Sequence, residues 1–218
     1  MRQMKTTESR DPAAAAGNPM SDRIVGAAFR AFMELGYTGT SMLEIATRAK
    51  VSKRDLYANF ASKQAILLAC IATRAVRMRL PPDLPVPSDR QVLGATLATF
   101  GATVVREVSQ PEVLAMFRLA IAEAERSPEV AETLNRSRSI NRGVLAGLLA
   151  QAQARGILGP GDPGQMTEQY FALLWGDLML SRLFGVVAPP KPAEIGRRAQ
   201  VAAEAFLRLY GRPAEAPL

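Results

Sequence analysis

Histidine is absent from this 218-residue chain, and cysteine occurs once, as Cys70. Without histidine there is no imidazole general base, no Ser-His or Cys-His nucleophile pair and no imidazole metal ligand. A single cysteine excludes a disulfide within the chain and, with histidine missing, a zinc site of the usual composition. We therefore expect no metal and no cofactor. The apolar, helical surroundings of Cys70 indicate a buried structural thiol.

Long apolar runs and glycine-rich phosphate loops are also missing. The most apolar stretch, residues 173–187, is interrupted by Asp177 and Arg182, and a membrane span needs about 18 apolar residues in a row. No P-loop and no GxGxxG motif is present. The first residues lack the apolar run of a signal peptide, so we expect a cytoplasmic protein with no membrane partner. An enzyme with a basic appendage is the least favoured class, since no catalytic motif accompanies the charge.

Positive charge is concentrated at one end of the chain. Residues 1–80 contain 13 Lys and Arg against 6 Asp and Glu, whereas residues 81–218 contain 14 of each kind. The whole net charge of +7 therefore belongs to the first 80 residues. Any one of these cations is explained equally well as part of a solvated helix face. A basic segment joined to a neutral one, however, indicates that the basic segment meets a polyanion.

The basic segment contains a helix-turn-helix pattern at residues 41–60 (SMLEIATRAKVSKRDLYANF). Ser41 and Glu44 have the spacing of a capping box at the start of the first helix, and Ser52 and Asp55 repeat it at the start of the second. The first helix has one apolar face with the spacing i, i+3, i+4, i+7, formed by Met42, Ile45, Ala46 and Ala49.

In the second helix of this motif, two apolar residues one turn apart, Leu56 and Phe60, are predicted to point inward. Basic and aromatic residues occupy the other sides, so the range 53–59 is a candidate recognition helix for a DNA groove. The residues predicted to point away from the interior are Lys53, Arg54, Tyr57 and Ala58.

The remaining pattern is helical throughout, which predicts an all-α protein of about nine helices. We expect a disordered arm at residues 1–17, a DNA-binding domain at 18–80 and a helical domain at 81–218, with prolines between 81 and 87 at the boundary. The first helix is predicted to end at Gly36, with one face formed by Ile24, Ala28, Ala31 and Leu35. The later helices are predicted to begin at Ser62, Ser88, Ser109, Ser127, Asp162 and Lys191, the one from Asp162 running to Phe184.

With these residues in view, the chain resembles the TetR/AcrR family of bacterial transcriptional regulators. The similarity is concentrated in residues 24–71, and its elements are Gly36-Tyr37 with Thr40, Ile45-Ala46 with Ala49, Val51-Ser52-Lys53, Leu56-Tyr57, Phe60 and Ser62-Lys63. Two positions depart from the usual pattern. Lys50 stands where glycine is usual in the turn, which predicts modest backbone strain, and Asn59 stands where histidine is common.

The resemblance implies a homodimer that binds a palindromic operator in double-stranded DNA. It places Thr40, Tyr57 and Lys63 at phosphates and Ser52, Lys53 and Arg54 at the leading end of the recognition helix. Arg54 is then the best candidate for reading a base edge, because a guanidinium can bind guanine through two hydrogen bonds. The complete set of expected DNA-binding residues is Thr40, Ser41, Ser52, Lys53, Arg54, Tyr57, Asn59 and Lys63.

The resemblance also implies an effector pocket in the C-terminal domain and a dimer interface formed by the last two helices. The candidate pocket residues are Met78, Phe100, Met116, Phe117, Trp175 and Met179. The candidate interface residues are Phe171, Leu174, Leu178, Val201, Ala205 and Leu209. For most of them an ordinary core position explains the apolar side chain as well. Asp177, Arg182 and Arg118 are expected to face a ligand or to pair across the dimer.

The favoured function is a repressor that a small apolar or amphipathic molecule releases from its operator. The alternative is a constitutive dimeric DNA-binding protein whose C-terminal helices serve dimerisation alone. A cavity in the region 81–218 distinguishes the two.

Overall fold

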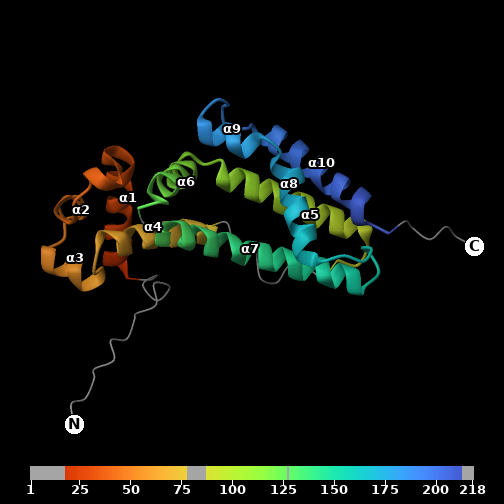
Figure 1. Cartoon of the computed structure of the whole chain (residues 1–218), viewed down its shortest axis with the longest axis horizontal. Coiled ribbons are helices and arrows are strands. Elements are labelled where there is room, and N and C mark those ends of the chain that lie inside the picture. Colours follow the sequence, from red (N-terminus) through yellow and green to blue (C-terminus); the bar gives the residue numbers. More distant parts are fainter. Residues whose placement is uncertain (1–17, 78–86, 127, 213–218) are drawn as a thin grey trace, which may run out of the picture. The chain divides into compact units, whose positions relative to one another are not determined.

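The computed structural model of the chain describes residues 18–77, 87–126 and 128–212 (Figure 1). Within these ranges the protein is helical and contains no strand, which confirms the predicted all-α class. The described residues form ten helices: α1 (Pro19–Gly39), α2 (Met42–Ala49), α3 (Lys53–Asn59), α4 (Lys63–Arg77), α5 (Arg90–Val108), α6 (Pro111–Glu123), α7 (Pro128–Ala154), α8 (Pro163–Trp175), α9 (Leu178–Phe184) and α10 (Pro192–Tyr210).

The helices form two compact units. One contains the described residues up to 74 and those within 122–134, and the other contains the described residues within 75–121 and 135–212. The predicted disordered arm at 1–17 and the predicted proline-rich boundary from 81 lie outside the described residues or at their edge. No helix in the described ranges is long and apolar enough to cross a membrane.

The first unit is organised around the apolar face of α1. Ile24, Ala28 and Ala31 are fully buried as predicted, but Leu35 is 46% exposed. The reason is Gly36, whose φ of 74° and ψ of 166° interrupt the helix one residue later. Leu35 lies at this interruption, where the face that the earlier residues share no longer meets the interior. The predicted stop at Gly36 is therefore a kink within α1 rather than its end.

Cys70 on α4 is buried in the same unit, as expected for a structural thiol. Its thiol donates a weak hydrogen bond to the carbonyl of Val25 on α1, with sulfur and oxygen 3.4 Å apart. Burial raises the pKa of Cys70 to about 12. The thiol is therefore neutral at physiological pH and acts as a small apolar group between α1 and α4.

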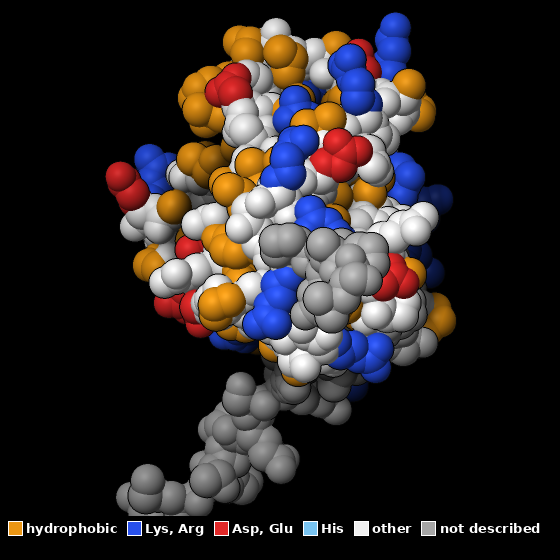
Figure 2. Space-filling model, turned by 90° about the vertical axis from the view of Figure 1, so that its right-hand side faces the viewer, with side chains coloured by type: hydrophobic (Ala, Val, Ile, Leu, Met, Phe, Trp, Pro, Cys, Tyr) orange, Lys and Arg blue, Asp and Glu red, His pale blue; other side chains and the backbone are white. Residues whose placement is uncertain are grey.

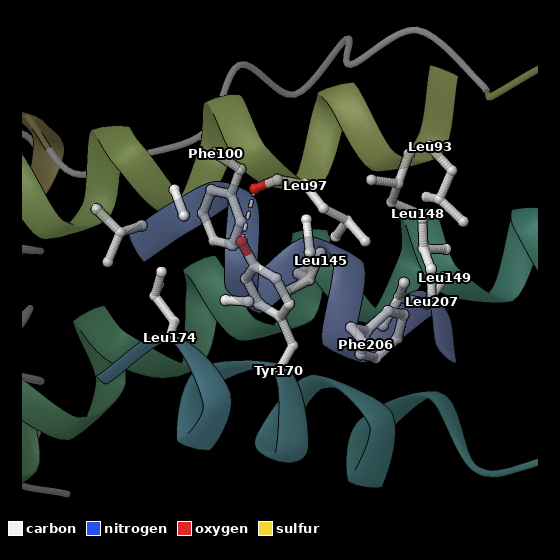
Figure 3. Close-up of a cluster of buried hydrophobic side chains, with 14 of the residues drawn as sticks. Leu93, Leu97, Phe100, Leu145, Leu148, Leu149, Tyr170, Leu174, Phe206 and Leu207 are labelled. Carbon is white, nitrogen blue, oxygen red and sulfur yellow. Dashed lines mark hydrogen bonds between the residues drawn. The ribbon is translucent and has the colours of Figure 1, made fainter. Parts of the chain in front are cut away.

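The second unit has a core in which α10 packs against α5 and α8 (Figure 1). Tyr170 of α8 is fully buried at its centre and points toward α5, where its hydroxyl donates a hydrogen bond of 2.6 Å to the carbonyl of Leu97 (Figure 3). The Phe100 ring stacks on the Tyr170 ring with the centroids 5.9 Å apart, and the Phe206 ring meets it edge-on with the centroids 5.8 Å apart. The polar end of this tyrosine is thus satisfied inside an aromatic cluster.

The helix predicted to continue from Asp162 to Phe184 is broken, and this accounts for ten helices rather than nine. Gly176 has a φ of 45° and a ψ of −127°, which ends α8, and α9 begins at Leu178. A side chain at position 176 would oppose this conformation, whereas glycine adopts it readily. The apolar periodicity continues across the break, so the sequence pattern did not reveal it.

Two predicted helix starts are also wrong. Asp89 rather than Ser88 caps α5, because its carboxylate accepts a hydrogen bond of 2.8 Å from the backbone N–H of Val92. Ser109 is the C-cap of α5, and α6 begins at Pro111. The starts expected at Asp162 and Lys191 are confirmed. Ser127 lies outside the described residues.

Candidate nucleic-acid interface

The helix-turn-helix is built as its capping residues predict. The Ser41 hydroxyl accepts a hydrogen bond of 3.0 Å from the backbone N–H of Glu44 at the start of α2. Ser52 does the same for Asp55 at the start of α3, also at 3.0 Å. These bonds satisfy N–H groups that the first turn of a helix leaves without a partner. Both predicted interface serines therefore use an oxygen lone pair to fix the ends of the motif helices.

The turn between α2 and α3 depends on Lys50. Its φ of 51° and ψ of 48° place it in the left-handed region, and among the described residues it is the one non-glycine residue with positive φ. Its backbone N–H contacts the carbonyls of Ala46 and Thr47, closing α2. The strain predicted from the missing glycine is therefore confirmed in the backbone.

Charged side chains join α2 to α1. Arg48 forms an ion pair within its own helix with Glu44, 2.6 Å between Nε and Oε1, and a second one with Glu34 on α1. Hydrogen bonds to Glu34 and then Glu44 raise the pKa of Arg48 above its ordinary value. This cation was not among the predicted DNA contacts, and its two carboxylate partners assign it to packing of the motif.

The recognition helix presents the expected surface. Leu56 and Phe60 are buried, whereas Lys53, Arg54 and Tyr57 are exposed. The Tyr57 side chain is 46% accessible, so its hydroxyl is at the surface. An ammonium, a guanidinium and a phenol on one short helix supply donors for both phosphate and base acceptors.

Asn59 at the end of α3 is engaged within the protein. Its amide nitrogen donates to the carbonyl of Asp55, 2.8 Å away, and its amide oxygen accepts from Asn18 at the start of α1, 3.4 Å away. The pairing of Asn59 with Asn18 was not anticipated from the sequence, because the two residues lie 41 positions apart. Asn18 itself caps α1 through the N–H of Met20.

Thr40 and Lys63, both predicted at phosphates, also have internal partners. Thr40 is 1% exposed, and its hydroxyl donates to the carbonyl of Gly36 at 2.7 Å. The Lys63 ammonium donates to the carbonyls of Tyr37 at 2.7 Å and Thr40 at 2.8 Å. It also lies over the Tyr37 ring, 4.3 Å from the centroid. The structure therefore joins Thr40 and Lys63 at the corner between α1 and α2.

Five of the six candidate effector residues lie in the core of the second unit or pack against it. Phe100 and Met116 are each 3% exposed. Three others are partly buried and pack against its hydrophobic core, namely Phe117, Trp175 and Met179. Met78 lies outside the described residues. Their role in ligand binding remains a prediction.

The charged residues expected to face a ligand or partner have different surroundings. Arg118 donates to the carbonyls of Leu183 and Arg182, and Arg182 donates to that of Val187, at distances of 2.6–2.9 Å. The two bonds from Arg118 satisfy carbonyls at the end of α9, which is too short to be stable alone, and the bond from Arg182 fastens the chain that follows it. Both arginines therefore hold α9 in place, and of the three predicted residues only Asp177 lines a surface hollow.

That hollow measures about 710 Å³ and lies on the surface of the second unit. It combines apolar side chains with two acidic and two basic ones. Its lining residues are Leu173, Asp177, Leu178, Ser181, Val187, Ala188, Pro190, Glu194, Arg197, Arg198 and Val201. Two predicted interface residues, Leu178 and Val201, are among them, and none of the predicted pocket residues is.

The other predicted interface residues differ in how much of each side chain is exposed. Leu209 is 63% exposed, and Phe171 and Ala205 are partly buried. Leu174 has no exposed surface in a single chain, so the prediction that it contacts a partner is wrong. It was placed there as an apolar residue of a helix expected at the interface, but it faces the protomer's own core.

The face of the molecule in Figure 2 shows cationic, acidic and hydrophobic side chains interspersed, with no large area of one kind. No group of three or more metal-ligating residues is present in the part of the chain that the structure describes.

Comparison with known proteins defines the class. Residues 24–70 match the model for bacterial regulatory proteins of the tetR family, and residues 95–212 match that for the AefR-like transcriptional repressor C-terminal domain. The chain is 28% identical over 195 residues to the transcriptional regulator UidR of Escherichia coli, which covers 84% of this chain and 88% of UidR.

Solved structures agree. A TetR-family transcriptional regulator from Mesorhizobium loti is 28% identical with a TM-score of 0.75, covering 88% of this chain and 97% of that one. The flavonoid-responsive regulator FrrA has the same identity and TM-score and covers 89% and 98%. The chain belongs to the TetR family. It is a DNA-binding transcriptional regulator with a helix-turn-helix domain followed by a helical C-terminal domain, and it is not an enzyme.

Proposed function

We propose that this regulator is a homodimeric repressor that binds a palindromic operator and is released from it by a small apolar or amphipathic molecule in the cytoplasm. The observation that carries the proposal is the pairing of two parts in one chain. A basic reading head exposes Lys53, Arg54 and Tyr57, and a neutral helical body matches the C-terminal domain of AefR-like repressors.

The reading head supports sequence-specific binding through α3. Arg54 is our candidate for a base edge, because it is exposed near the start of the helix and can donate two parallel hydrogen bonds to guanine. Lys53 and Tyr57 are candidates for phosphates, and the exposed Ser41 and Ser52 lie at the starts of the two motif helices. One such helix reads only a few base pairs, so a dimer on two half-sites is needed for specificity.

The surface hollow supports dimerisation. Its charges are mixed, with Asp177 and Glu194 beside Arg197 and Arg198. A two-fold axis brings the same patch of both subunits together, so a patch that carries both signs can be complementary to itself. Exposed apolar residues on the same helices add contact area, namely Leu173, Leu180, Phe184 and Val201.

An aromatic cluster in the second unit supports an apolar effector. Phe171 meets the rings of Phe100 and Tyr170 edge-on, at centroid distances of 5.8 and 6.0 Å. Phe117, Trp175 and Met179 lie partly buried against the same core. Such side chains favour flat, apolar molecules. The structural relative FrrA is flavonoid-responsive by name, which is consistent with a ligand of this kind.

A pool of random or genomic duplex DNA, exposed to the purified protein, tests the proposal. We expect recovered fragments with two inverted half-sites, and binding that weakens steeply with salt as counterions are released. Titrating apolar aromatic compounds with and without the recovered duplex then tests release, since ligand and DNA must weaken each other by the same factor. Tight-binding compounds that leave DNA affinity unchanged would establish the constitutive alternative instead.

A further inference from the structure

We propose that Arg138 and Arg142 of α7 form a binding site for an anionic group, and that the effector is an organic acid with an aromatic body. The inference rests on the proposed function and deepens it, because it assigns a chemical class to the molecule that releases the operator. The observations that carry it lie on one face of α7 and on the neighbouring α8, all within the second unit.

The face of α7 that meets the core changes from apolar to polar along the helix. Positions three or four residues apart share one face of a helix. In the second half of α7 this face is buried in the hydrophobic core (Figure 3) and consists of Leu145, Leu148, Leu149 and Ala152. In the preceding turns the same face consists of Arg138, Asn141 and Arg142. A face that served packing alone would continue with apolar side chains.

The protein neutralises these two guanidiniums only in part. Arg142 forms an ion pair with Glu168 of α8, 3.2 Å between Nη1 and Oε1, and the Glu168 side chain is 67% exposed. Arg138 has no hydrogen-bond or ion-pair partner among the described residues. Desolvation by the protein around it, and then repulsion from Arg142, lower the pKa of Arg138. Arginine remains protonated in proteins, so a bound anion would offset this repulsion. Arg138 keeps accessible surface through which an anion can reach it.

A buried polar atom on the same face also lacks a partner. The side-chain oxygen of Asn141 is buried and accepts no hydrogen bond within the described residues. A buried acceptor without a donor is unfavourable. Because Asn141 shares the face of both arginines, a hydroxyl or N–H group close to the acidic group of a ligand would supply that donor.

Aromatic side chains lie directly beside this polar cluster. The guanidinium carbon of Arg142 is 5.5 Å from the centroid of the Phe171 ring on α8. Phe171 is only partly buried, and it meets the rings of Phe100 and Tyr170 edge-on. Ligand sites combine apolar walls with a few polar groups that fix orientation, and a guanidinium can bind an acidic group through two parallel hydrogen bonds. Two cations beside an aromatic wall therefore suit an aromatic acid.

Two fluorescent probes that differ by one acidic group test the proposal. Anilinonaphthalene sulfonate is an aromatic acid, and N-phenylnaphthylamine has the same ring system without the sulfonate. Both fluoresce strongly in an apolar environment, so titration into the protein gives an affinity for each. We define the anion selectivity as the ratio of the sulfonate affinity to the amine affinity. Changes in apolar packing that affect both probes alike leave this ratio unchanged.

We expect Arg138→Gln and Arg142→Gln each to lower the anion selectivity at least about tenfold, because each removes a charge-assisted hydrogen bond. Glu168→Gln should raise the selectivity, since its carboxylate competes with the ligand for Arg142. A merely structural role of Glu168 would not produce this gain. Arg136→Gln is the matched control, because it removes one exposed arginine from another face of α7 and should leave the selectivity unchanged.

Three outcomes would overturn the proposal. They are a sulfonate that does not bind the wild-type protein, a selectivity that is unchanged in Arg138→Gln, and an equal fall in Arg136→Gln, which would mean that net surface charge alone attracts the sulfonate. Arg138 has no partner to lose, so Arg138→Gln should retain its helices, which circular dichroism verifies. This variant decides the proposal even if Arg142→Gln does not fold.

A DNA measurement separates this inference from the proposed function. Affinity for a duplex recovered by selection is measured by fluorescence anisotropy with and without the sulfonate. We expect the sulfonate to weaken DNA binding by the wild-type protein, and to do so less for Arg138→Gln at the same concentration. If the two arginines determine the anion selectivity while DNA affinity does not change, the anion site is established and the proposed release by an effector fails.

Discussion

At the scale of single residues, Cys70 illustrates how burial opposes ionisation. Cys70 is buried between α1 and α4 with its thiol bonded to a backbone carbonyl, and its pKa is raised to about 12. In an unfolded chain a cysteine titrates near pH 8.5. The folded state therefore binds a proton that the unfolded state releases over this range.

The sign of the pH dependence follows from that difference. Above about pH 8.5 the unfolded state holds fewer protons, so stability falls as pH rises, by up to about 1.4 kcal/mol per unit. We expect the decline between about pH 8.5 and 10, before lysine and tyrosine titrate. Chemical unfolding at several pH values measures it, with Cys70→Ala as the control that lacks this contribution. Equal pH dependence in both proteins would contradict the assignment.

Residue patterns predicted the positions that local bonding determines and missed those that depend on packing. Ser41 and Ser52 cap their helices as expected because a cap needs only the residues that follow it. The internal partners of Lys63, the carbonyls of Tyr37 and Thr40, lie more than twenty positions away in the sequence. No local spacing distinguishes a lysine that meets a distant carbonyl from one that meets phosphate.

At the scale of elements, the turn between α2 and α3 contains stored strain that a substitution can release. Lys50 is in the left-handed region, which costs a non-glycine residue about 1–2 kcal/mol. Glycine removes this cost but adds about 0.5–1 kcal/mol of entropy to the unfolded chain. We expect Lys50→Gly to stabilise the first unit by a net amount of about 0.5–1 kcal/mol.

Thermal unfolding of Lys50→Gly measures this gain. Lys50→Ala is the matched control, since it removes the same charge and keeps a Cβ atom in the strained conformation. A midpoint that rises equally in both variants would mean that charge, rather than backbone strain, sets the effect.

A second contact between elements depends on the absence of a side chain. A Cβ atom at Gly101 on α5 would overlap the Tyr170 hydroxyl and lie 2.9 Å from the Leu174 side chain on α8. We expect Gly101→Ala to lose about 1–3 kcal/mol of stability by overpacking, which exceeds the gain of up to about 1 kcal/mol from better helix propensity.

The double variant Gly101→Ala with Tyr170→Phe tests the cause. Removing the hydroxyl alone costs about 1 kcal/mol through its bond to Leu97. In the double variant the new methyl group occupies the vacated space. Its loss of stability in calorimetry should therefore be smaller than the sum of the losses in the two single variants. If the stability losses of the two single variants simply add in the double variant, the overpacking does not arise at the Tyr170 hydroxyl.

The broken helix at Gly176 shows the limit of prediction at this scale. Apolar spacing continues from Leu174 to Leu178, and a lone glycine is tolerated within many helices. The break depends on contacts that hold α9 from outside. Arg118 of α6 donates to the carbonyls of Arg182 and Leu183, and Arg182 of α9 donates to that of Ser109. The sequence contains both arginines, but their spacing does not show that they bind carbonyls.

At the scale of the whole molecule, the proposed function requires two chains, and we propose that they meet at the hollow on the second unit. Val201 lines it and is 55% exposed in a single chain. In the proposed dimer the partner covers this side chain, so a carboxylate there is desolvated, at a cost that the neighbouring Arg197 and Arg198 offset only in part. We expect Val201→Asp to be a folded monomer that has lost most of its affinity for a two-site duplex.

Analytical ultracentrifugation measures the mass, and circular dichroism establishes the fold. Ile121→Asp is the matched control, because Ile121 is 62% exposed on α6 and does not line the hollow. It should remain a dimer and bind DNA normally. If Val201→Asp sediments as a dimer, this face is not the interface. The two chains then associate through another surface, because a single α3 presents too few donors to select one operator.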